Sequence, residues 1–253
     1  VFFMNIEAKE LSKIYGSGES RVVALDKVNL EIASSDFISI MGPSGSGKST
    51  LVNLIPRFFD VTSGRILVDG VDIRKIKLHD LRQRIGYVPQ KGVLFSGTID
   101  SNIRYGKPEA TEAEVKRAAE IAQAWEFIQD KEDGMDSAIA QGGSNVSGGQ
   151  KQRLSIARAI AKEPEIYIFD DSFSALDYKT DVVLRRALKK ETKDATTLIV
   201  AQRISTILHA DKILVLDEGK VVGQGTHKEL LKSCDVYRQI AMSQLSEEEL
   251  ADE

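Results

Sequence analysis

The chain has 253 residues, of which 42% are hydrophobic and 28% are charged, as in an ordinary globular protein. Its formal net charge is −4 and its basic residues are spread along the whole length, so the composition gives no basic footprint for nucleic acid. Cys234 is the only cysteine, which excludes an internal disulfide and a thiolate metal cluster and favours a cytosolic compartment. No stretch approaches the roughly 18 apolar residues of a membrane-spanning helix.

Strands are predicted at short apolar or alternating runs that turn residues bound on both sides. Two alternating runs, at residues 22–32 and 65–68, predict a small antiparallel sheet toward the N-terminus. Helical patterns separate the other runs, so right-handed crossovers and a largely parallel sheet are expected for them. These almost wholly apolar runs predict buried strands at residues 37–41, 166–169, 196–200 and 212–216.

Helices are predicted from capping signals and from apolar residues that repeat on one face. Thr111 with Glu114, and Thr226 with Glu229, have the spacing of a capping box, which starts a helix. Pro56 ends or kinks the first helix. The predicted helices cover residues 49–55, 111–125, 150–161 and a segment after residue 226.

No internal repeat, low-complexity segment or long linker divides the chain. We therefore expect residues 1–253 to form one domain of the α/β class, with a helical insertion at about residues 90–160.

The residues directly after the predicted strand at 37–41 have the full pattern of a phosphate loop. Glycines in such a loop let the backbone wrap phosphate groups, and the N–H groups point inward at the start of the following helix. The pattern assigns Lys48 to the β- and γ-phosphates and Ser49 to Mg²⁺, so ATP and Mg²⁺ are the expected ligands. The predicted nucleotide-binding residues are Gly42, Pro43, Ser44, Gly45, Ser46, Gly47, Lys48, Ser49 and Thr50.

A second glycine-rich turn occurs about a hundred residues later, at Ser147, Gly148, Gly149 and Gln150. Lying at the start of a predicted helix, it offers a second group of backbone N–H donors for a phosphate. One nucleotide cannot easily use both turns of the same chain, so the pair indicates ATP sandwiched between two subunits.

With both motifs in this order, the chain resembles the ATPase domain of an ABC transporter. The resemblance covers nearly the whole chain and implies a P-loop core with a small antiparallel β-subdomain and an inserted α-helical subdomain. It also implies a second ABC ATPase domain as partner and a transmembrane domain that these residues do not include. The expected location is the cytoplasmic face of a membrane.

The resemblance assigns roles to further residues. Asp170 matches the Walker B aspartate, which holds Mg²⁺ through water, and Gln90 matches the Q-loop glutamine, which reaches Mg²⁺ and the attacking water. Tyr15 falls where an aromatic ring stacks on adenine. A helix-capping role for Asp170 and a plain core or surface role for Tyr15 are the alternatives. The residues that resemble the D-loop, which crosses the dimer interface, are Ser174, Ala175, Leu176 and Asp177.

Two positions depart from the family pattern. Asp171 stands where the family has the glutamate that polarises water; its carboxylate is set back by about 1 Å, and misplacement of that order costs about 10²-fold in rate. Gln202 stands at the switch-loop histidine, and its side chain donates a hydrogen bond but carries no positive charge. Together they predict a site that hydrolyses slowly or not at all, although each alone could be neutral variation.

The glycine-rich turn at residues 147–150 matches the signature motif of the family. Many exporters have a glutamate shortly before it that touches the coupling helices of the membrane domain; this chain has Gln141 there, and simple drift in a loop explains the change at least as well.

The resemblance is uneven along the chain. From Arg57 onward the chain resembles exporters. Within that part, residues 169–177 and 201–203 look like the catalytically impaired half of a heterodimeric bacterial multidrug exporter. Up to about Thr50 the chain looks closer to free-standing ATPase subunits of lipoprotein or macrolide extrusion systems. Natural variation and recombination both account for such a mosaic.

The sequence therefore predicts the ATPase domain of an ABC exporter, which closes on ATP against a partner domain and reopens on hydrolysis. Three alternatives stay open: a free-standing ATPase subunit of an importer or extractor, a non-transport ABC protein of DNA repair or translation, and a regulatory module that binds nucleotide without turnover. Val1 is not an initiator, so either membrane helices precede it or vector residues precede Met4.

Overall fold

The computed structural model describes residues 4–204, 207–208 and 210–245. The chain forms two compact units, the first made of Val1–Arg84 with Asp194–Glu253 and the second of Ile85–Lys193. The expectation of one domain over residues 1–253 stays a prediction.

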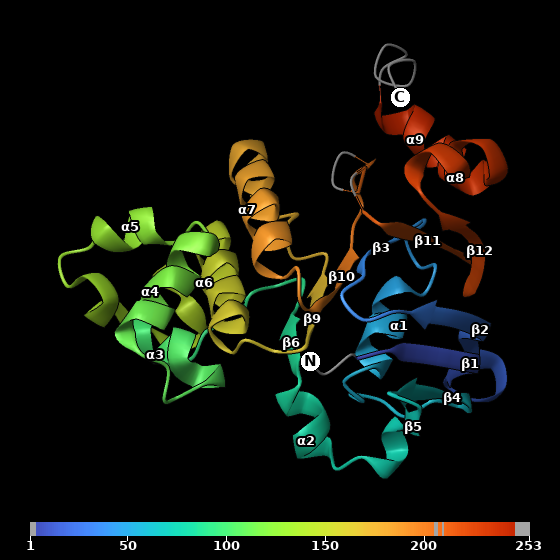
Figure 1. Ribbon diagram of the computed structural model, residues 1–253, viewed down its shortest axis with the longest axis horizontal. Helices are drawn as coiled ribbons and strands as arrows, with labels where there is room; N and C mark the ends of the chain where they lie inside the picture. The colour runs from blue at the N-terminus through green and yellow to red at the C-terminus, as the bar shows by residue number, and fades with distance from the viewer. Residues whose placement is uncertain (1–3, 205–206, 209, 246–253) are drawn as a thin grey trace. The chain divides into compact units, whose positions relative to one another are not determined.

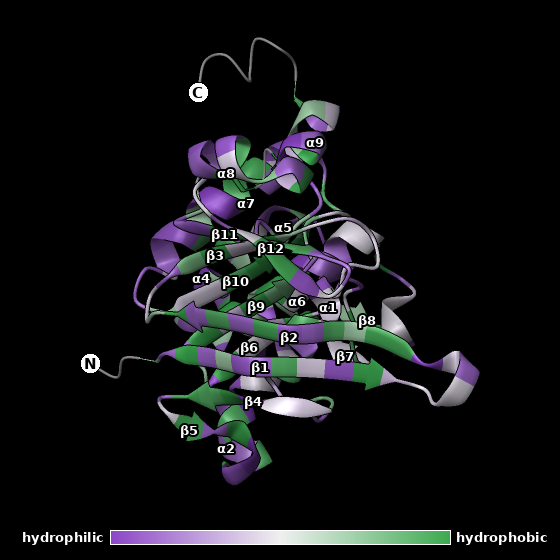
Figure 2. Ribbon diagram, turned by 90° about the vertical axis from the view of Figure 1, so that its right-hand side faces the viewer, coloured by the Kyte–Doolittle hydropathy of each residue, from purple (hydrophilic) through white to green (hydrophobic). Residues whose placement is uncertain are grey.

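The first unit contains a four-stranded sheet in the order β2-β1-β4-β5. β1 pairs antiparallel with both β2 and β4, which confirms the predicted antiparallel sheet. Hydrophilic and hydrophobic residues alternate along parts of β1 and β2, as Figure 2 shows, because one face of each strand is buried there. The strands are β1 (Ile6–Tyr15), β2 (Val22–Ile32), β4 (Ser63–Val68) and β5 (Val71–Asp72).

The sequence analysis missed β1, although this strand lies between the two that were predicted. Its pairing register with β2 shifts between Ala8 and Leu11 and again between Leu11 and Ile14. Such irregularities break the strict alternation from which a half-buried strand is recognised.

The same unit contains four more strands, in the order β12-β11-β3-β10. β3 pairs parallel with both β10 and β11, and β12 adds an antiparallel edge. The residues of β10 are all buried, as expected for a central strand of such a sheet. The bounds are β3 (Phe37–Met41), β10 (Thr196–Val200), β11 (Lys212–Asp217) and β12 (Lys220–Gly225).

Two helices of the first unit, α1 and α8, begin near the predicted positions, whereas α2 and α9 were not predicted. α1 follows β3 through the phosphate loop and ends before Pro56, and a capping box between Thr226 and Glu229 starts α8. The helices are α1 (Lys48–Leu54), α2 (Leu78–Gln83), α8 (His227–Ser233) and α9 (Asp235–Gln244), with 3-10 turns at Gly18–Ser20 and Ile73–Lys75.

In the second unit, β6 (Ile85–Val88) pairs parallel with β9 (Ile166–Asp170). The chain between these strands is largely helical, which confirms the predicted insertion, and α3, α4 and α6 pack together (Figure 1). α7 follows β9. The remaining elements are β7 (Gly97–Thr98), β8 (Ala138–Ile139), α3 (Ile99–Ile103), α4 (Glu112–Ile121), α5 (Trp125–Gln129), α6 (Gly148–Ala161), α7 (Tyr178–Glu191) and 3-10 turns at Arg104–Gly106, Gly134–Asp136 and Gln141–Gly143.

The predicted helix from Thr111 to about Trp125 is too long by about four residues at its C-terminal end. Thr111 and Glu114 form the expected capping box, but α4 ends at Ile121. Gln123 adopts a left-handed conformation with φ of 57°, and its carbonyl accepts a 2.6 Å hydrogen bond from Arg153 Nη1. A tertiary contact therefore accompanies the break, which the local sequence does not signal.

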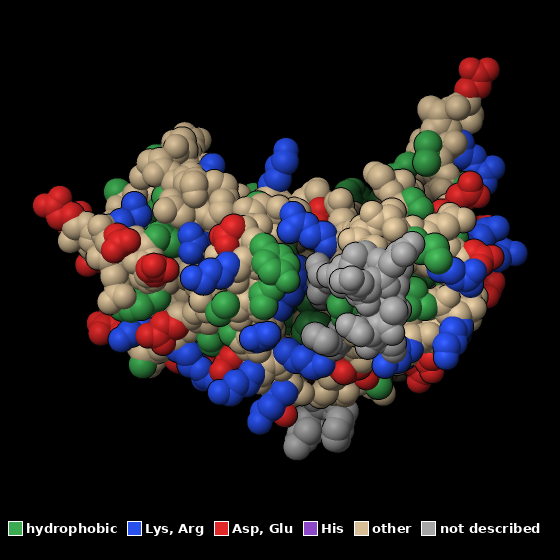
Figure 3. Space-filling view, turned by 90° about the horizontal axis from the view of Figure 1, so that it is seen from above, with side chains coloured by type: hydrophobic (Ala, Val, Ile, Leu, Met, Phe, Trp, Pro, Cys, Tyr) green, Lys and Arg blue, Asp and Glu red, His purple; other side chains and the backbone are tan. Residues whose placement is uncertain are grey.

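Basic and acidic side chains are interspersed over the face shown in Figure 3. Among the described residues, no helix is long and apolar enough to cross a membrane.

Candidate nucleotide-binding site

The predicted site residues divide between the two units. Tyr15, the phosphate loop and Gln202 belong to the first unit. Gln90, Asp170, Asp171, the signature turn and the D-loop residues belong to the second.

The phosphate loop connects β3 to α1 and is organised around the side chain of Lys48. The Lys48 amine donates to the carbonyl oxygens of Gly42 at 2.7 Å and Pro43 at 2.6 Å, and lies 3.3 Å from Ser46 Oγ. Lys48 is only 9% exposed. The loop therefore holds a buried positive charge directly before the first turn of α1, where an anionic phosphate is favoured.

Two glycines of the loop are required by close contacts with neighbouring strands. Gly42 has φ of 150°, and a Cβ there would lie 1.9 Å from the carbonyl oxygen of Leu216. Gly47 has φ of 100°, and its Cβ would lie 2.4 Å from the carbonyl oxygen of Ala24. Any other residue at either position would push the loop away from β11 or β2.

Tyr15 lies at the end of β1 and is partly exposed. Its ring contacts Phe59 edge to face, with centroids 6.1 Å apart and an angle of 87° between the planes. The Lys13 amine lies 4.9 Å from the centroid of the same ring. Tyr15 is thus a partly exposed aromatic held by two neighbours, and its role in stacking on adenine stays a prediction.

Gln202 is exposed and follows β10. The side chain of Gln244, on α9, donates from Nε2 to the carbonyl oxygen of Gln202 at 2.8 Å and accepts from the Ile204 N–H at 2.8 Å. α9 therefore fixes the backbone at Gln202 and at Ile204, on the two sides of Arg203. Sequence reasoning missed Gln244, since nothing local links it to a loop about 40 residues earlier.

Asp170 is the last residue of β9 and is 6% exposed. Its Oδ2 accepts a hydrogen bond from the Tyr87 hydroxyl at 3.1 Å. Burial, followed by the charge of Asp170 and this hydrogen bond, raises the pKa of Tyr87 well above its ordinary value, so the hydroxyl remains a donor at physiological pH. The helix-capping alternative for Asp170 is wrong, because the residue that caps α7 is Asp177.

Asp171 follows directly, in a left-handed conformation with φ of 49°, and is 7% exposed. Gln90 Nε2 donates to Asp171 Oδ2 at 2.9 Å. The structure therefore brings together two residues that the sequence predicted to act on the attacking water. Ser174 Oγ donates to the Asp171 carbonyl oxygen at 2.9 Å, which ties the start of the D-loop to the same residue.

The signature turn is the N-terminus of α6, which begins two residues before the predicted start at residue 150. Gln150 N–H donates to Ser147 Oγ at 3.2 Å and Ser147 N–H donates to Gln150 Oε1 at 3.0 Å, forming a capping box. Neither Gly148 nor Gly149 has a left-handed φ. A Cβ on Gly148 would meet nothing within 4 Å, and one on Gly149 would lie 3.5 Å from the Ala175 carbonyl oxygen.

The D-loop residues lead directly into α7, and Asp177 is the N-cap of this helix. Asp177 accepts from Thr180 N–H at 3.0 Å and from Thr180 Oγ1 at 2.7 Å, and these bonds hold the pKa of its carboxyl below the ordinary value. Leu176 is buried, whereas Ser174 and Ala175 are exposed. The exposed pair leaves this segment accessible to another molecule.

A model of the ABC transporter family matches residues 25–174, which is more than half of the chain. The chain belongs to the ABC transporter family. The α/β fold of its ATPase domains, with an antiparallel β-subdomain and a helical subdomain, is thereby confirmed.

Similar proteins place this ABC ATPase domain with exporters. A Staphylococcus aureus protein named as a multidrug export ATP-binding/permease protein is 46% identical over 235 residues, covering 93% of this chain and 40% of that protein. An ABC transporter ATP-binding protein of Mycobacterium bovis is 48% identical over 223 residues, covering 87% of this chain and 38% of that protein. The structure of a bacterial Atm1-family ABC exporter with ATP bound superposes with a TM-score of 0.91 at 38% identity, covering 98% of this chain and 43% of that one.

This ABC ATPase domain thus spans about two fifths of the length of the curated relatives it matches. These comparisons show an ABC transporter ATPase domain, and the proteins it is similar to include exporters. The resemblance of residues up to about Thr50 to extrusion subunits, and of the rest to one half of a heterodimer, stays a prediction.

The donor groups of the ABC ATPase domain fit Mg²⁺. Among residues 4–204, 207–208 and 210–245, no group of three or more His, Cys, Asp and Glu side chains could hold a metal alone. The predicted ligands Ser49, Gln90 and Asp170 offer only oxygen atoms as metal ligands, which Mg²⁺ prefers, and Mg²⁺ commonly completes its shell with water and substrate phosphates. The donor set therefore suits an ion that arrives with the nucleotide.

Proposed function

We propose that this chain is the nucleotide-hydrolysing domain of an ABC exporter that closes on Mg-ATP against a second ABC ATPase domain. Closure and reopening drive export through a transmembrane domain, at the cytoplasmic face of the membrane. The relatives that carry both ATP-binding and permease functions support this proposal, and they weigh against a free-standing importer subunit.

The observation that carries the proposal is the pair of glycines at the start of α6. Glycine in the middle of a helix costs about 0.5–1 kcal/mol relative to alanine, which is an upper bound for Gly148 and Gly149 in the first turn of α6. Nothing among the described residues of the chain requires glycine at Gly148 or Gly149. Their backbone is not left-handed, and a Cβ on either would meet only open space or an ordinary contact. The absence of side chains therefore serves a molecule outside the chain, and backbone N–H groups at a helix N-terminus suit a phosphate.

Each residue of the site then has a chemical task. The buried Lys48 amine binds phosphate oxygens, the loop N–H groups orient them, and Tyr15 stacks on the base. Ser49 and Asp170 are the residues that would bind Mg²⁺, and the ion would neutralise phosphate charge. Gln90 and Asp171, joined by their 2.9 Å hydrogen bond, orient the attacking water.

The catalytic pair is poorly equipped for fast hydrolysis. The short side chain of Asp171 is already engaged by Gln90 Nε2, and its backbone is fixed by Ser174 Oγ. Gln202 supplies no positive charge for the γ-phosphate. We propose that this site turns over slowly, and that the intact signature turn completes a faster site on a different partner chain.

A test measures ATP binding and phosphate release by the isolated chain with Mg²⁺. We expect binding with slow turnover, and removal of the residual turnover by Asp171→Asn. Rapid hydrolysis by the unmodified chain would contradict the proposal that this site turns over slowly, but it would not affect the proposal that the chain belongs to an exporter.

A second candidate is a regulatory module that binds ATP and never hydrolyses it. Asp171 and Gln202 are the observations in its favour. Measurable phosphate release that requires Asp171 separates the two candidates, because a purely regulatory module shows none.

A further inference from the structure

Gln152 lies in α6, two residues beyond the signature turn, and is 1% exposed. Its Nε2 donates to the carbonyl oxygen of Pro89 at 3.0 Å, and its Oε1 accepts from the N–H of Gly92 at 2.8 Å. One buried carboxamide therefore binds the backbone on both sides of Gln90.

The loop that carries Gln90 packs directly against the backbone of the signature helix. A Cβ on Gly92 would lie 2.8 Å from both the carbonyl carbon and the oxygen of Lys151, so the approach requires glycine. On the other side of the loop, Ser172 Oγ donates to the carbonyl oxygen of Val88 at 2.8 Å. The loop is thus held between α6 and the residue that follows Asp171.

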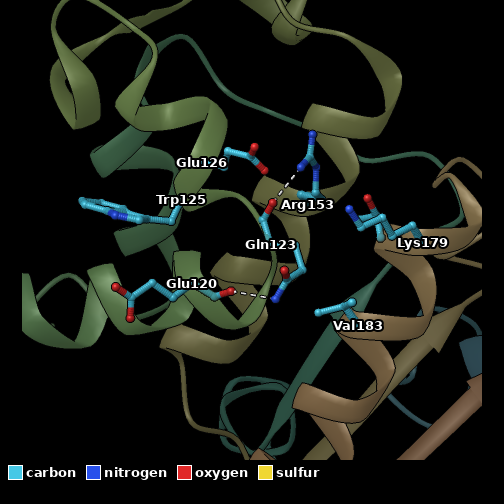
Figure 4. Close-up of a pocket in the computed structure, with 8 residues that line it drawn as sticks. Glu120, Gln123, Trp125, Glu126, Arg153, Lys179 and Val183 are labelled. Atoms are coloured by element: carbon cyan, nitrogen blue, oxygen red, sulfur yellow. Dashed lines mark hydrogen bonds between the residues drawn. The ribbon is translucent and has the colours of Figure 1, made fainter.

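The signature helix is itself fixed by the next side chain. Arg153 Nη1 donates to the Gln123 carbonyl oxygen, and its guanidinium carbon lies 4.7 Å from the centroid of Phe127. Figure 4 shows the Arg153 guanidinium directed at this carbonyl, beside a pocket of about 350 Å³ that Trp125 and Val183 also line. Gln152 and Arg153 therefore tie α6 to two different segments.

We infer that Gln152 is a positioning residue that couples the signature turn to Gln90. The inference rests on the proposed function, in which the N-terminus of α6 binds a phosphate held by the partner while Gln90 serves the nucleotide of this chain. A shift of α6 on binding the partner's phosphate moves Pro89 and Gly92 through Gln152. The hydrogen bond from Gln90 to Asp171 then changes with the occupancy of the opposite site.

The test uses Gln152→Met, which keeps the length of the side chain and removes both hydrogen bonds. Hydrogen exchange of the Gly92 amide in the full chain without nucleotide should accelerate by about fivefold or more. Gln129→Met, at an exposed position on α5, is the matched control and should leave this amide unchanged. Unchanged exchange in a folded Gln152→Met chain overturns the inference.

A mutant cycle tests the link to Gln90. Gln152→Met should lower kcat for ATP by about fivefold with little change in KM, and it should add nothing in a Gln90→Ala background. Independent, additive effects overturn the inference.

Gln152→Asn, which is shorter but still polar, serves if the methionine variant does not fold, and it should shift both measurements in the same direction. A wild-type chain without turnover refutes the proposed hydrolysis, and the exchange result then decides the role of Gln152 alone.

Discussion

Asp171 combines a short carboxylate with a left-handed backbone, φ 49°. We predict that Asp171→Glu together with Gln202→His raises the ATP turnover of the chain by up to about 10²-fold, because the longer carboxylate and the imidazole both reach toward the attacking water and the γ-phosphate. The double variant should exceed either single variant, and the effects should not add. Steady-state phosphate release measures this.

A stability measurement accompanies that prediction. Aspartate tolerates a left-handed conformation better than glutamate, so Asp171→Glu should lower the free energy of unfolding by up to about 1 kcal/mol while raising turnover. Denaturant unfolding provides the comparison. A double variant that turns over at the starting rate would show that another defect limits the site.

Tyr87 lies three residues before Gln90, and the sequence predicted no role for its side chain. We predict that Tyr87→Phe weakens Mg²⁺-dependent ATP binding about fivefold, because Asp170 loses the hydroxyl that orients it, a hydrogen bond worth about 1 kcal/mol. Titration of ATP with and without Mg²⁺ measures the effect. Tyr167→Phe on β9 is the matched control, since Tyr167 is buried and stacks on Phe169. Equal losses in both variants would contradict a specific role for Tyr87.

The sequence proposes candidate residues for the site but not the contacts between them. Local patterns assign Gln90 and Asp171, because each lies in a recognisable motif. Their hydrogen bond joins residues 81 positions apart, and that from Gln152 to the Pro89 carbonyl spans 63 positions. Contacts of this kind depend on the packing of α6 and β9, which no periodicity in the chain encodes.

At the scale of elements, α6 shows a conflict between local propensity and proposed function. We predict that Gly148→Ala leaves the free energy of unfolding unchanged or raises it by up to about 1 kcal/mol, since alanine favours the helix and a Cβ meets nothing within 4 Å. The same change should lower ATP turnover of the assembled dimer, because the methyl group occupies the approach of the partner's phosphate. Denaturant unfolding and ATPase assays together test it; a destabilised chain would contradict the prediction.

Buried strands were the most predictable elements. β3 and β10 have the predicted bounds, Phe37–Met41 and Thr196–Val200, because continuous apolar runs between turn residues leave few alternatives. β1 was missed because its irregular pairing disturbs the alternation, and α4 was overextended because the break at Gln123 involves a contact with Arg153. Tertiary structure outweighs local propensity in both cases.

At the scale of the whole molecule, the chain is about 40% of the length of its curated relatives. Its own phosphate loop and its signature turn belong to different compact units, and the proposed function assigns them to different nucleotides. The two motifs should therefore be separable by mutation. A substitution in the phosphate loop should prevent ATP binding by this chain. A substitution in the signature turn should prevent hydrolysis of the ATP that the partner binds.

If the chain pairs with a different partner as proposed, we predict that Gly149→Asp abolishes hydrolysis by the assembled dimer, because it places a negative charge at the helix N-terminus proposed to receive the partner's phosphate. The Cβ itself fits, 3.5 Å from the Ala175 carbonyl oxygen, so ATP binding by the Lys48 loop of the same chain should persist.

Lys48→Ala should have the opposite pattern. It removes the buried amine that organises the phosphate loop, so this chain loses its own ATP, yet turnover at the faster site continues on the partner's lysine. ATPase activity of the reconstituted pair, with photolabelling to measure nucleotide occupancy in each chain, distinguishes the two variants. If Lys48→Ala proves as damaging to turnover as Gly149→Asp, the two sites depend equally on this chain and the proposed asymmetry fails.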